Sequence, residues 1–279
     1  MRKKSIKQRG FETPRQLGKA IIFRTGGNMP YILEVCIAGK TKEVSKYHSS
    51  RWKIKGEKRE KKAKKTTNTQ EKVNLRLATK NLRRKMNHNF EDGDYLVTFD
   101  FRKEERPKCS KEMTRYMSNF LKRLRNQYKK LDLELKYIYV KELGPKGGAH
   151  IHMVMNRAPD GIEILRKCWT HGGIHVDPLN TDGQYEKIAE YFVKYANKTI
   201  ETEGKQIGKK YYPSQNLKEP VVKKKIIWKS NTFRTTAKEE KGYYLEKESV
   251  VEGENKWGYE YFSYTLHQSK TIRKERKLE

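Results

Sequence analysis

Apolar positions recur at helical spacing in four segments of the chain. In residues 110–131, SKEMTRYMSNFLKRLRNQYKKL, six large apolar or aromatic side chains fall on one face, which is typical of an amphipathic helix. Residues 66–90 carry an apolar stripe beside a basic face, and residues 161–169 and 183–198 repeat the helical pattern. The sequence therefore predicts four helices.

Strand-like runs separate these helices. Residues 94–101, DYLVTFDF, and 133–143, LELKYIYVKEL, have the composition of strands, and 149–156, AHIHMVMN, follows after a glycine-rich turn. A short strand is expected in 172–179. Hairpin connections make neighbouring strands antiparallel. We therefore predict an α+β fold, a largely antiparallel sheet flanked by helices.

The two ends of the chain differ from this centre. Residues 1–30 are expected to form an arm, residues 30–47 a strand hairpin, and the pattern after residue 200 weakens into short basic and aromatic runs. We divide the chain into a basic N-terminal arm and helix (1–90), a core (91–200) and a C-terminal basic and aromatic extension (201–279).

Charge indicates the class of partner. The chain of 279 residues carries a formal net charge of +30, and 35% of its residues are charged. Such an excess of Lys and Arg favours a polyanionic partner, most often nucleic acid, over a merely solvated surface. No apolar run is long enough for a membrane span, and the N-terminus lacks the apolar stretch of a signal peptide. Three scattered cysteines predict no disulfide framework, which fits a cytoplasmic location.

Two histidines stand one residue apart in the strand 149–156. Because side chains alternate faces along a strand, His150 and His152 point to one side, while the Ile and Met residues between and after them point to the core. Alone, the pair is more often structural than metal-binding. Glu142 ends the preceding strand, and the hairpin should bring it close to the histidines. Two imidazoles and a carboxylate suit a catalytic divalent ion, Mg²⁺ or Mn²⁺, with Zn²⁺ also open.

The helix 183–198 contains a possible nucleophile. Tyr191 and Tyr195 lie one turn apart beside the apolar face, and Lys194 and Lys198 flank them. An ammonium group favours the phenolate form of a tyrosine, and a metal ion makes a phosphate more electrophilic. In isolation, a helix whose tyrosines only border the core is the more common case. Together with the Glu-His-His set, the arrangement is far more specific.

Several basic side chains are candidates for contacts with DNA phosphates. The segment 51–65, RWKIKGEKREKKAKK, has nine Lys or Arg against two Glu, and it is either a phosphate-contacting segment or a linker. The candidates lie in this segment and on the predicted helices: Arg51, Lys53, Lys55, Arg76, Arg83 and Lys194. His171 and His175 are spare histidines, which we interpret as structural or DNA-facing.

This combination of motifs resembles the HUH endonucleases, specifically the replication initiators of rolling-circle plasmids and single-stranded DNA phages. YLVTFDF is similar to their first motif, HIHMV to their two-histidine motif and YFVKYANK to their tyrosine motif. The resemblance covers about residues 90–200. It implies a five-stranded antiparallel sheet, a metal site at Glu142, His150 and His152, and attack by Tyr195, or by Tyr195 and Tyr191 in turn, to give a 5′-phosphotyrosine.

The resemblance also implies the partners. The substrate would be single-stranded or cruciform origin DNA, and because no phosphate-binding loop for ATP occurs, a host helicase and polymerase would be needed. A relaxase or a single-strand transposase with the same site is an alternative, although the tyrosines follow the histidines here, which favours an initiator. A non-catalytic basic nucleic-acid-binding protein is a further alternative. The sequence leaves the oligomeric state open.

Overall fold

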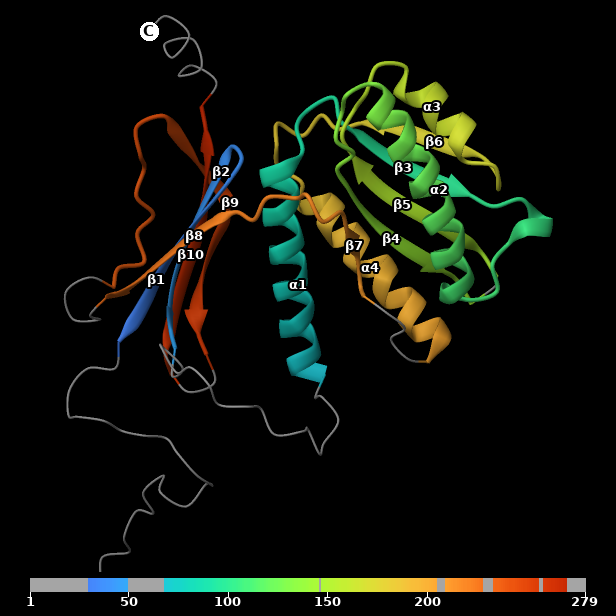
Figure 1. Ribbon diagram of the computed structural model, residues 1–279. Coiled ribbons are helices and arrows are strands. Elements are labelled where there is room, and N and C mark those ends of the chain that lie inside the picture. Colours follow the sequence, from blue (N-terminus) through green and yellow to red (C-terminus); the bar gives the residue numbers. More distant parts are fainter. Residues whose placement is uncertain are drawn as a thin grey trace, which may run out of the picture.

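The computed structural model describes residues 30–49, 68–145, 147–204, 209–227, 233–255 and 258–269. These residues form two five-stranded antiparallel sheets and four α-helices, with one helix standing between the sheets (Figure 1). The predicted α+β fold with a five-stranded antiparallel sheet and flanking helices is confirmed. The expected arm before residue 30 and the basic segment 51–65 lie outside the described residues.

The sheet built from the middle of the chain is called here the central sheet. Its strands, in spatial order, are β6 (Ile174–Pro178), β3 (Tyr95–Asp100), β5 (Ala149–Met155), β4 (Tyr137–Leu143) and β7 (Tyr212–Pro213). The four helices are α1 (Asn68–Asn89), α2 (Ser110–Lys130), α3 (Gly161–Cys168) and α4 (Glu186–Glu203). A short 3-10 helix, Lys103–Glu105, precedes α2.

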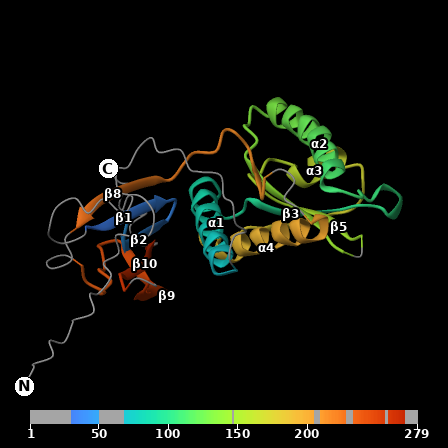
Figure 2. The ribbon, with the colours of Figure 1, turned by 90° about the horizontal axis from the view of Figure 1, so that it is seen from below.

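Helices cover both faces of the central sheet, which explains why its strands are so apolar. On one face, Ile151 and Met153 of β5 pack with Phe120 of α2 in a fully buried cluster. On the other face, Val154 packs with Phe192 of α4 and with residues of α1. Figure 2 shows α1 and α4 together on one side of the sheet and α2 and α3 on the other. The apolar residues of β5 thus face a helix on either side.

A second sheet, called here the outer sheet, was not predicted. It consists of β8 (Val221–Ile227), β1 (Tyr31–Ala38), β2 (Thr41–His48), β10 (Glu260–Gln268) and β9 (Tyr243–Glu254), in that order. The predicted hairpin of residues 30–47 is present as β1 and β2, and β2 pairs with β10. Segments that the sequence assigned to an N-terminal arm and to a C-terminal extension therefore share one sheet.

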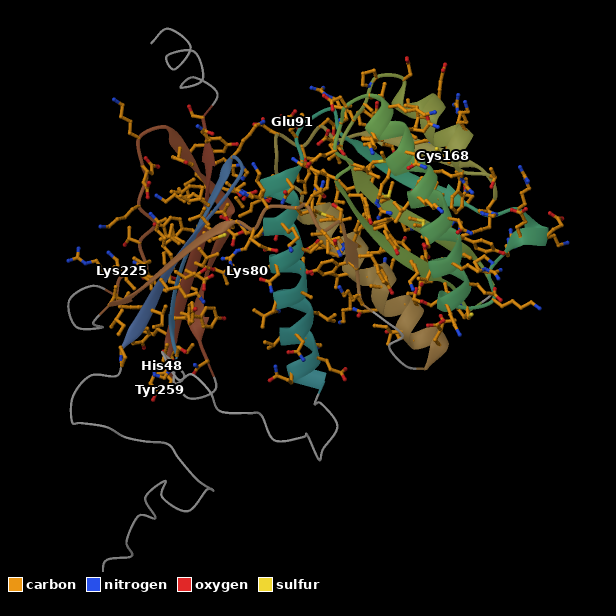
Figure 3. All side chains as sticks on the ribbon, in the orientation of Figure 1. His48, Lys80, Glu91, Cys168, Lys225 and Tyr259 are labelled. Carbon is orange, nitrogen blue, oxygen red and sulfur yellow. The ribbon has the colours of Figure 1, made fainter. Side chains whose placement is uncertain are left out.

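Buried ion pairs connect the outer sheet to α1. Arg84 of α1 contacts Glu34 at 2.9 Å and Glu43 at 2.8 Å, and Arg83 contacts Glu43 and Glu186, each at 2.8 Å. Lys80 donates to Ser45 Oγ at 3.1 Å on the same side of the helix (Figure 3). The basic face of α1 was expected to turn toward DNA. Part of it instead faces the outer sheet, because the carboxylates of Glu34 and Glu43 are buried there and require cationic partners.

The turn between β1 and β2 fits closely against the C-terminal end of α1. Gly39 has φ of +58°, and a Cβ at this position would lie 1.9 Å from the carbonyl oxygen of Asn87. Only glycine tolerates both conditions. Lys40 then contacts Asp92 and Asp182, at 3.2 Å and 2.8 Å. None of the helices that the structure describes is long and apolar enough to span a bilayer.

Candidate active site

The hairpin of β4 and β5 brings the predicted carboxylate and histidines together. Glu142 lies directly opposite His150 in the antiparallel register, and the chain reverses through Gly144, whose amide donates to the Gly148 carbonyl at 2.7 Å. Gly147 has φ of +76°, a conformation that favours glycine. The glycines of the sequence motif therefore form the turn that places Glu142 beside His150, as predicted.

A chain of polar contacts runs from His152 through Glu142 to α4. His152 Nε2 lies 2.9 Å from Glu142 Oε2, and the Lys198 ammonium donates to Glu142 Oε1 at 2.5 Å. His152 is only 3% exposed, whereas the side chain of Lys198 is 42% exposed. The carboxylate thus links a buried imidazole to a cation at the edge of the site.

The sequence did not single out Thr98 and Asp100 of β3, which hold the two histidines from the other side. Thr98 Oγ1 lies 3.1 Å from His152 Nδ1, and Asp100 Oδ1 lies 2.6 Å from His150 Nδ1. The signal that was available is their spacing in VTFDF: as alternate residues of one strand they share a face, and β3 pairs with β5. Polar residues on a strand adjacent to two histidines are candidates for orienting them.

The end of β3 at Asp100 is fixed by the turn before β6. The Asp100 amide donates to the Gly173 carbonyl at 3.0 Å, and Trp169 Nε1 donates to the Asp100 carbonyl at 3.1 Å. A Cβ on Gly172 would lie 2.1 Å from that same carbonyl oxygen. The close approach requires glycine at position 172, and it holds the Asp100 backbone next to His150.

Both tyrosines of α4 lie against His152. The Tyr191 hydroxyl is 3.4 Å from His152 Nδ1, and the rings of Tyr195 and His152 have centroids 4.9 Å apart. The two tyrosine rings meet edge to face at 4.2 Å, and Lys198 Nζ lies 5.6 Å from the Tyr195 ring centroid. This placement follows from α4, whose apolar face, with Ala189 and Phe192, packs on the sheet.

Electrostatics within the cluster assign protonation states. Burial would raise the pKa of Glu142, but hydrogen bonds from Lys198 and His152 outweigh burial and hold that pKa below its usual value. Burial lowers the pKa of His152 despite the neighbouring carboxylate, which favours a neutral imidazole. The hydrogen bond to Glu142 raises the pKa of Lys198, so that the ammonium stays charged.

The two tyrosines are not equivalent. Burial is the main cause that raises the pKa of Tyr191, and the hydrogen bond with Tyr195 adds to it. Tyr195 has the Lys198 ammonium beside its ring, whereas within the described part of the chain no cation lowers the pKa of Tyr191. Tyr191 is therefore the harder of the two to ionise by its own surroundings.

The donor set has the chemistry of a divalent metal site, but the three ligands are not arranged as a cage. Among the described residues, no group of three or more His, Cys, Asp or Glu side chains is placed to hold a metal ion. Glu142 bonds directly to His152, and the two imidazole centroids are 6.3 Å apart. If the proton of His152 sits on Nδ1, toward Thr98, the Nε2 lone pair faces Glu142. That pattern, with the outer nitrogen held by a polar partner, is common for metal-binding histidines.

The remaining candidates lie elsewhere. His171 Nδ1 contacts Glu105 at 2.9 Å and His175 Nε2 contacts Asp177 at 3.2 Å, so both are paired outside the tyrosine cluster. Lys194 on α4 and Arg76 on α1 are exposed, as a contact with DNA would require. Arg83 is engaged by Glu43 and Glu186 instead. Arg51, Lys53 and Lys55 lie outside the described residues.

Residues 94–200 match a family of replication-associated proteins, described as the ORF2 and gene II protein type. The matched span contains Glu142, His150, His152 and both tyrosines. Comparisons with curated proteins and with solved structures found no significant match. The family match supports the role of a replication initiator of phage or plasmid type for this chain.

Proposed function

We propose that this protein starts rolling-circle replication by cutting and later rejoining one DNA strand, in the manner of the HUH endonucleases. The observation that carries the proposal is the convergence of Tyr195, His152, Glu142 and Lys198 from three elements, β4, β5 and α4, within the span that matches the replication-associated family. Binding alone would not require a nucleophile, a cation and a carboxylate at one place.

The proposed reaction is a transesterification at phosphorus. The Tyr195 phenol oxygen attacks the scissile phosphate, and the bond between phosphorus and the 3′ oxygen breaks. A 5′-phosphotyrosine forms, the phenol proton leaves to solvent, and the departing 3′ oxygen takes up one proton to become a hydroxyl. One phosphoester replaces another, so the reverse reaction rejoins a strand without ATP, while the free 3′ end is available for polymerisation.

Lys198 and Glu142 have distinct roles in this proposal. The Lys198 ammonium lies near the Tyr195 ring and favours the phenolate, because a nearby positive charge stabilises the charged form of an acid. Glu142 holds that ammonium in place through its Oε1 atom. Since Glu142 keeps Lys198 protonated, Lys198 acts as an electrostatic stabiliser rather than as a base.

Tyr191 would serve a second transfer. Its hydroxyl is next to His152 and its ring touches Tyr195, so a strand held at one tyrosine is within reach of the other. Two tyrosines that act in turn could start and end one round of replication. Tyr195 is assigned the first attack, because it has the neighbouring cation.

Glu142, His150 and His152 are the residues that would hold Mg²⁺ or Mn²⁺. The donor set fits such an ion chemically, and Asp100 and Thr98 would orient the two imidazoles. When bound, a divalent ion supplies a Lewis acid that polarises the scissile phosphate. His152 stays neutral because burial lowers its pKa, which is the form that a metal ligand must have.

The proposed substrate is single-stranded or cruciform origin DNA. The net charge of +30 and the exposed Lys194 and Arg76 suit phosphate contacts, and such binding weakens steeply with salt. No phosphate-binding loop for ATP occurs in the sequence, so a host helicase, together with a host polymerase, is the proposed source of unwinding and synthesis.

The decisive test is a covalent adduct. Labelled origin single strand is incubated with the protein and Mn²⁺, and the products are resolved under denaturing conditions. We expect a protein–DNA band that the Tyr191→Phe/Tyr195→Phe variant does not form, although that variant still binds the strand. An adduct with the double variant would contradict the tyrosine assignment. DNA binding by the wild-type protein without cleavage of any strand would instead support a non-catalytic nucleic-acid-binding protein.

A further inference from the structure

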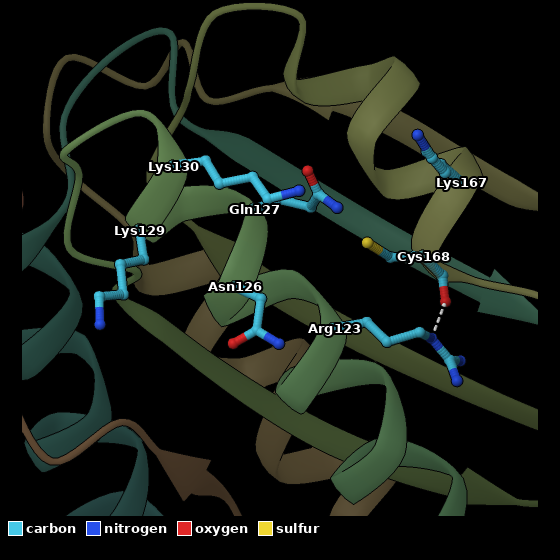
Figure 4. Close-up of a pocket in the computed structure, with 7 residues that line it drawn as sticks. All are labelled: Arg123, Asn126, Gln127, Lys129, Lys130, Lys167 and Cys168. Atoms are coloured by element: carbon cyan, nitrogen blue, oxygen red, sulfur yellow. Dashed lines mark hydrogen bonds between the residues drawn. The ribbon is translucent and has the colours of Figure 1, made fainter.

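A basic pocket lies between α2 and α3, on the face of the central sheet opposite the tyrosines. It has a volume of about 660 Å³. Four cations, two amides and one thiol line it: Arg123, Asn126, Gln127, Lys129, Lys130, Lys167 and Cys168 (Figure 4). No carboxylate is among these lining residues. Figure 3 shows Cys168, and with it the pocket, far from the outer sheet.

The sequence builds this pocket from one stripe of α2. Arg123, Gln127 and Lys130 are spaced by four and three residues, which places them on the same side of a helix. That side faces α3, which contributes Lys167 and Cys168 at its C-terminal end. In Figure 4, Lys129 points away from the other side chains, so Arg123, Lys130 and Lys167 are the cations that converge.

Arg123 is held in place with part of its donor capacity unused. Its Nε donates to the Cys168 carbonyl at 3.0 Å, which orients the planar guanidinium. Its Nη2 atom is buried and has no hydrogen-bond partner among the described residues. A buried donor without an acceptor is costly in a folded protein, and a bound anion would satisfy it.

Helix dipoles explain only part of this arrangement. Lys129, Lys130 and Lys167 lie in the last turns of α2 and α3, where positive charge is favourable. Arg123 lies about two turns before the end of α2, beyond the reach of that effect. Its unpaired Nη2 and the absence of acidic lining residues require another reason.

We propose that this pocket binds phosphates of the DNA backbone, an assignment that rests on the proposed DNA-processing function. A guanidinium and two ammonium groups without a carboxylate suit phosphate oxygens. No aromatic side chain lines the pocket to stack a nucleobase, so we favour the sugar-phosphate backbone over a free nucleotide.

The position of the pocket defines which part of the DNA it would contact. Ser110, at the start of α2, accepts a hydrogen bond from Lys141, the neighbour of Glu142, at 3.1 Å. At 1.5 Å per residue, Arg123 and Lys130 lie roughly 20–30 Å further along α2. The pocket would therefore contact DNA that flanks the cleavage site by about one helical turn, rather than the scissile phosphate.

The test measures DNA affinity against salt concentration in EDTA, with a random-sequence duplex. Each phosphate contact that is lost should lower the slope of log affinity against log salt by about one. We expect this loss for Lys130→Ala and for Lys167→Ala, and a loss of about two for the double variant. Lys122→Ala, an exposed neighbour on α2 outside the pocket, serves as the matched control and should keep the wild-type slope.

Two results would overturn the assignment. One is an equal slope for the pocket variants and Lys122→Ala. The other is ATP binding by the wild-type protein that the double variant loses while its DNA slope stays unchanged, since the pocket would then be a nucleotide site. Because the assay contains no metal and requires no cleavage, it fails independently of the adduct test. Adduct formation with unchanged slopes would contradict the pocket alone.

Discussion

The carboxylate of Glu142 bonds to His152 rather than to His150, the residue directly opposite it in the sheet. The Glu142 Oε2 to His152 Nε2 distance is 2.9 Å, whereas the strand register pairs Glu142 with His150. The contact is diagonal, within the reach of long side chains across neighbouring strands. It leaves His150 to Asp100, so each histidine has its own acidic partner.

The two tyrosines should separate when they are replaced singly. Tyr195→Phe is expected to reduce adduct formation at least about 1000-fold, because it removes the phenol that lies beside Lys198. Tyr191→Phe should still form the adduct in a single turnover and lose the second transfer. Single-turnover and strand-transfer assays on labelled DNA measure the two steps. Equal loss of the first step in both variants would contradict the assignment of Tyr195 as the first nucleophile.

Lys198→Met should slow adduct formation by about 10–100-fold at saturating DNA, because a charge that favours the phenolate is lost. Lys194→Met is the matched control, since it removes a positive charge from the same helix at an exposed position. We expect the control to weaken DNA binding and to keep the rate at saturation. Single-turnover rates and binding curves separate the effects, and equal rates for the two variants would refute the role of Lys198.

Asp100 should influence metal affinity without touching the metal. Asp100→Asn removes the carboxylate that orients His150, and we expect Mn²⁺ binding to weaken about 10–100-fold in calorimetric titration. Asp177→Asn is the control, because Asp177 partners His175, outside the tyrosine cluster. Chelation of the metal should abolish the adduct in the wild-type protein. Unchanged Mn²⁺ affinity in Asp100→Asn would argue against the proposed metal site.

Glu34 should make stability depend on pH in the acid range. Burial alone would raise its pKa, but Lys224 and Arg84 outweigh burial and lower the pKa from 4.5 to about 2. A lowered carboxyl pKa contributes stability above the unfolded value, and that contribution is lost as the pH falls from 4.5 toward 2. The shift corresponds to about 3 kcal/mol at neutral pH.

The measurement compares denaturant unfolding of the wild-type protein and Glu34→Gln between pH 7 and pH 2. The difference in the free energy of unfolding should be largest near neutrality and shrink with acid. Glu163→Gln, at an exposed position on α3, is the control and should show little difference at any pH. A constant difference for Glu34→Gln over the whole range would show that the ion pairs with Arg84 and Lys224 do not set its stability.

The sequence by itself determined the elements of residues 94–200 and the residues of the candidate site. Side-chain alternation placed Ile151 and Met153 in the core, and helical periodicity placed Tyr191 and Tyr195 on one side of α4. The glycine turn between Glu142 and His150 is local as well. These features depend on spacing over a few residues, where the geometry of strand, helix and turn leaves few alternatives.

Only the tertiary structure decided the features that join distant segments. Pairing of β2 with β10 creates the outer sheet from segments more than 200 residues apart, and no local pattern encodes such a pairing. The positive charge of Arg83 suggested a DNA contact, yet its partners Glu43 and Glu186 come from other elements. Likewise, Asp100 gains a role only when β3 lies next to β5. A side chain's charge is written in the sequence, whereas its partner is set by packing.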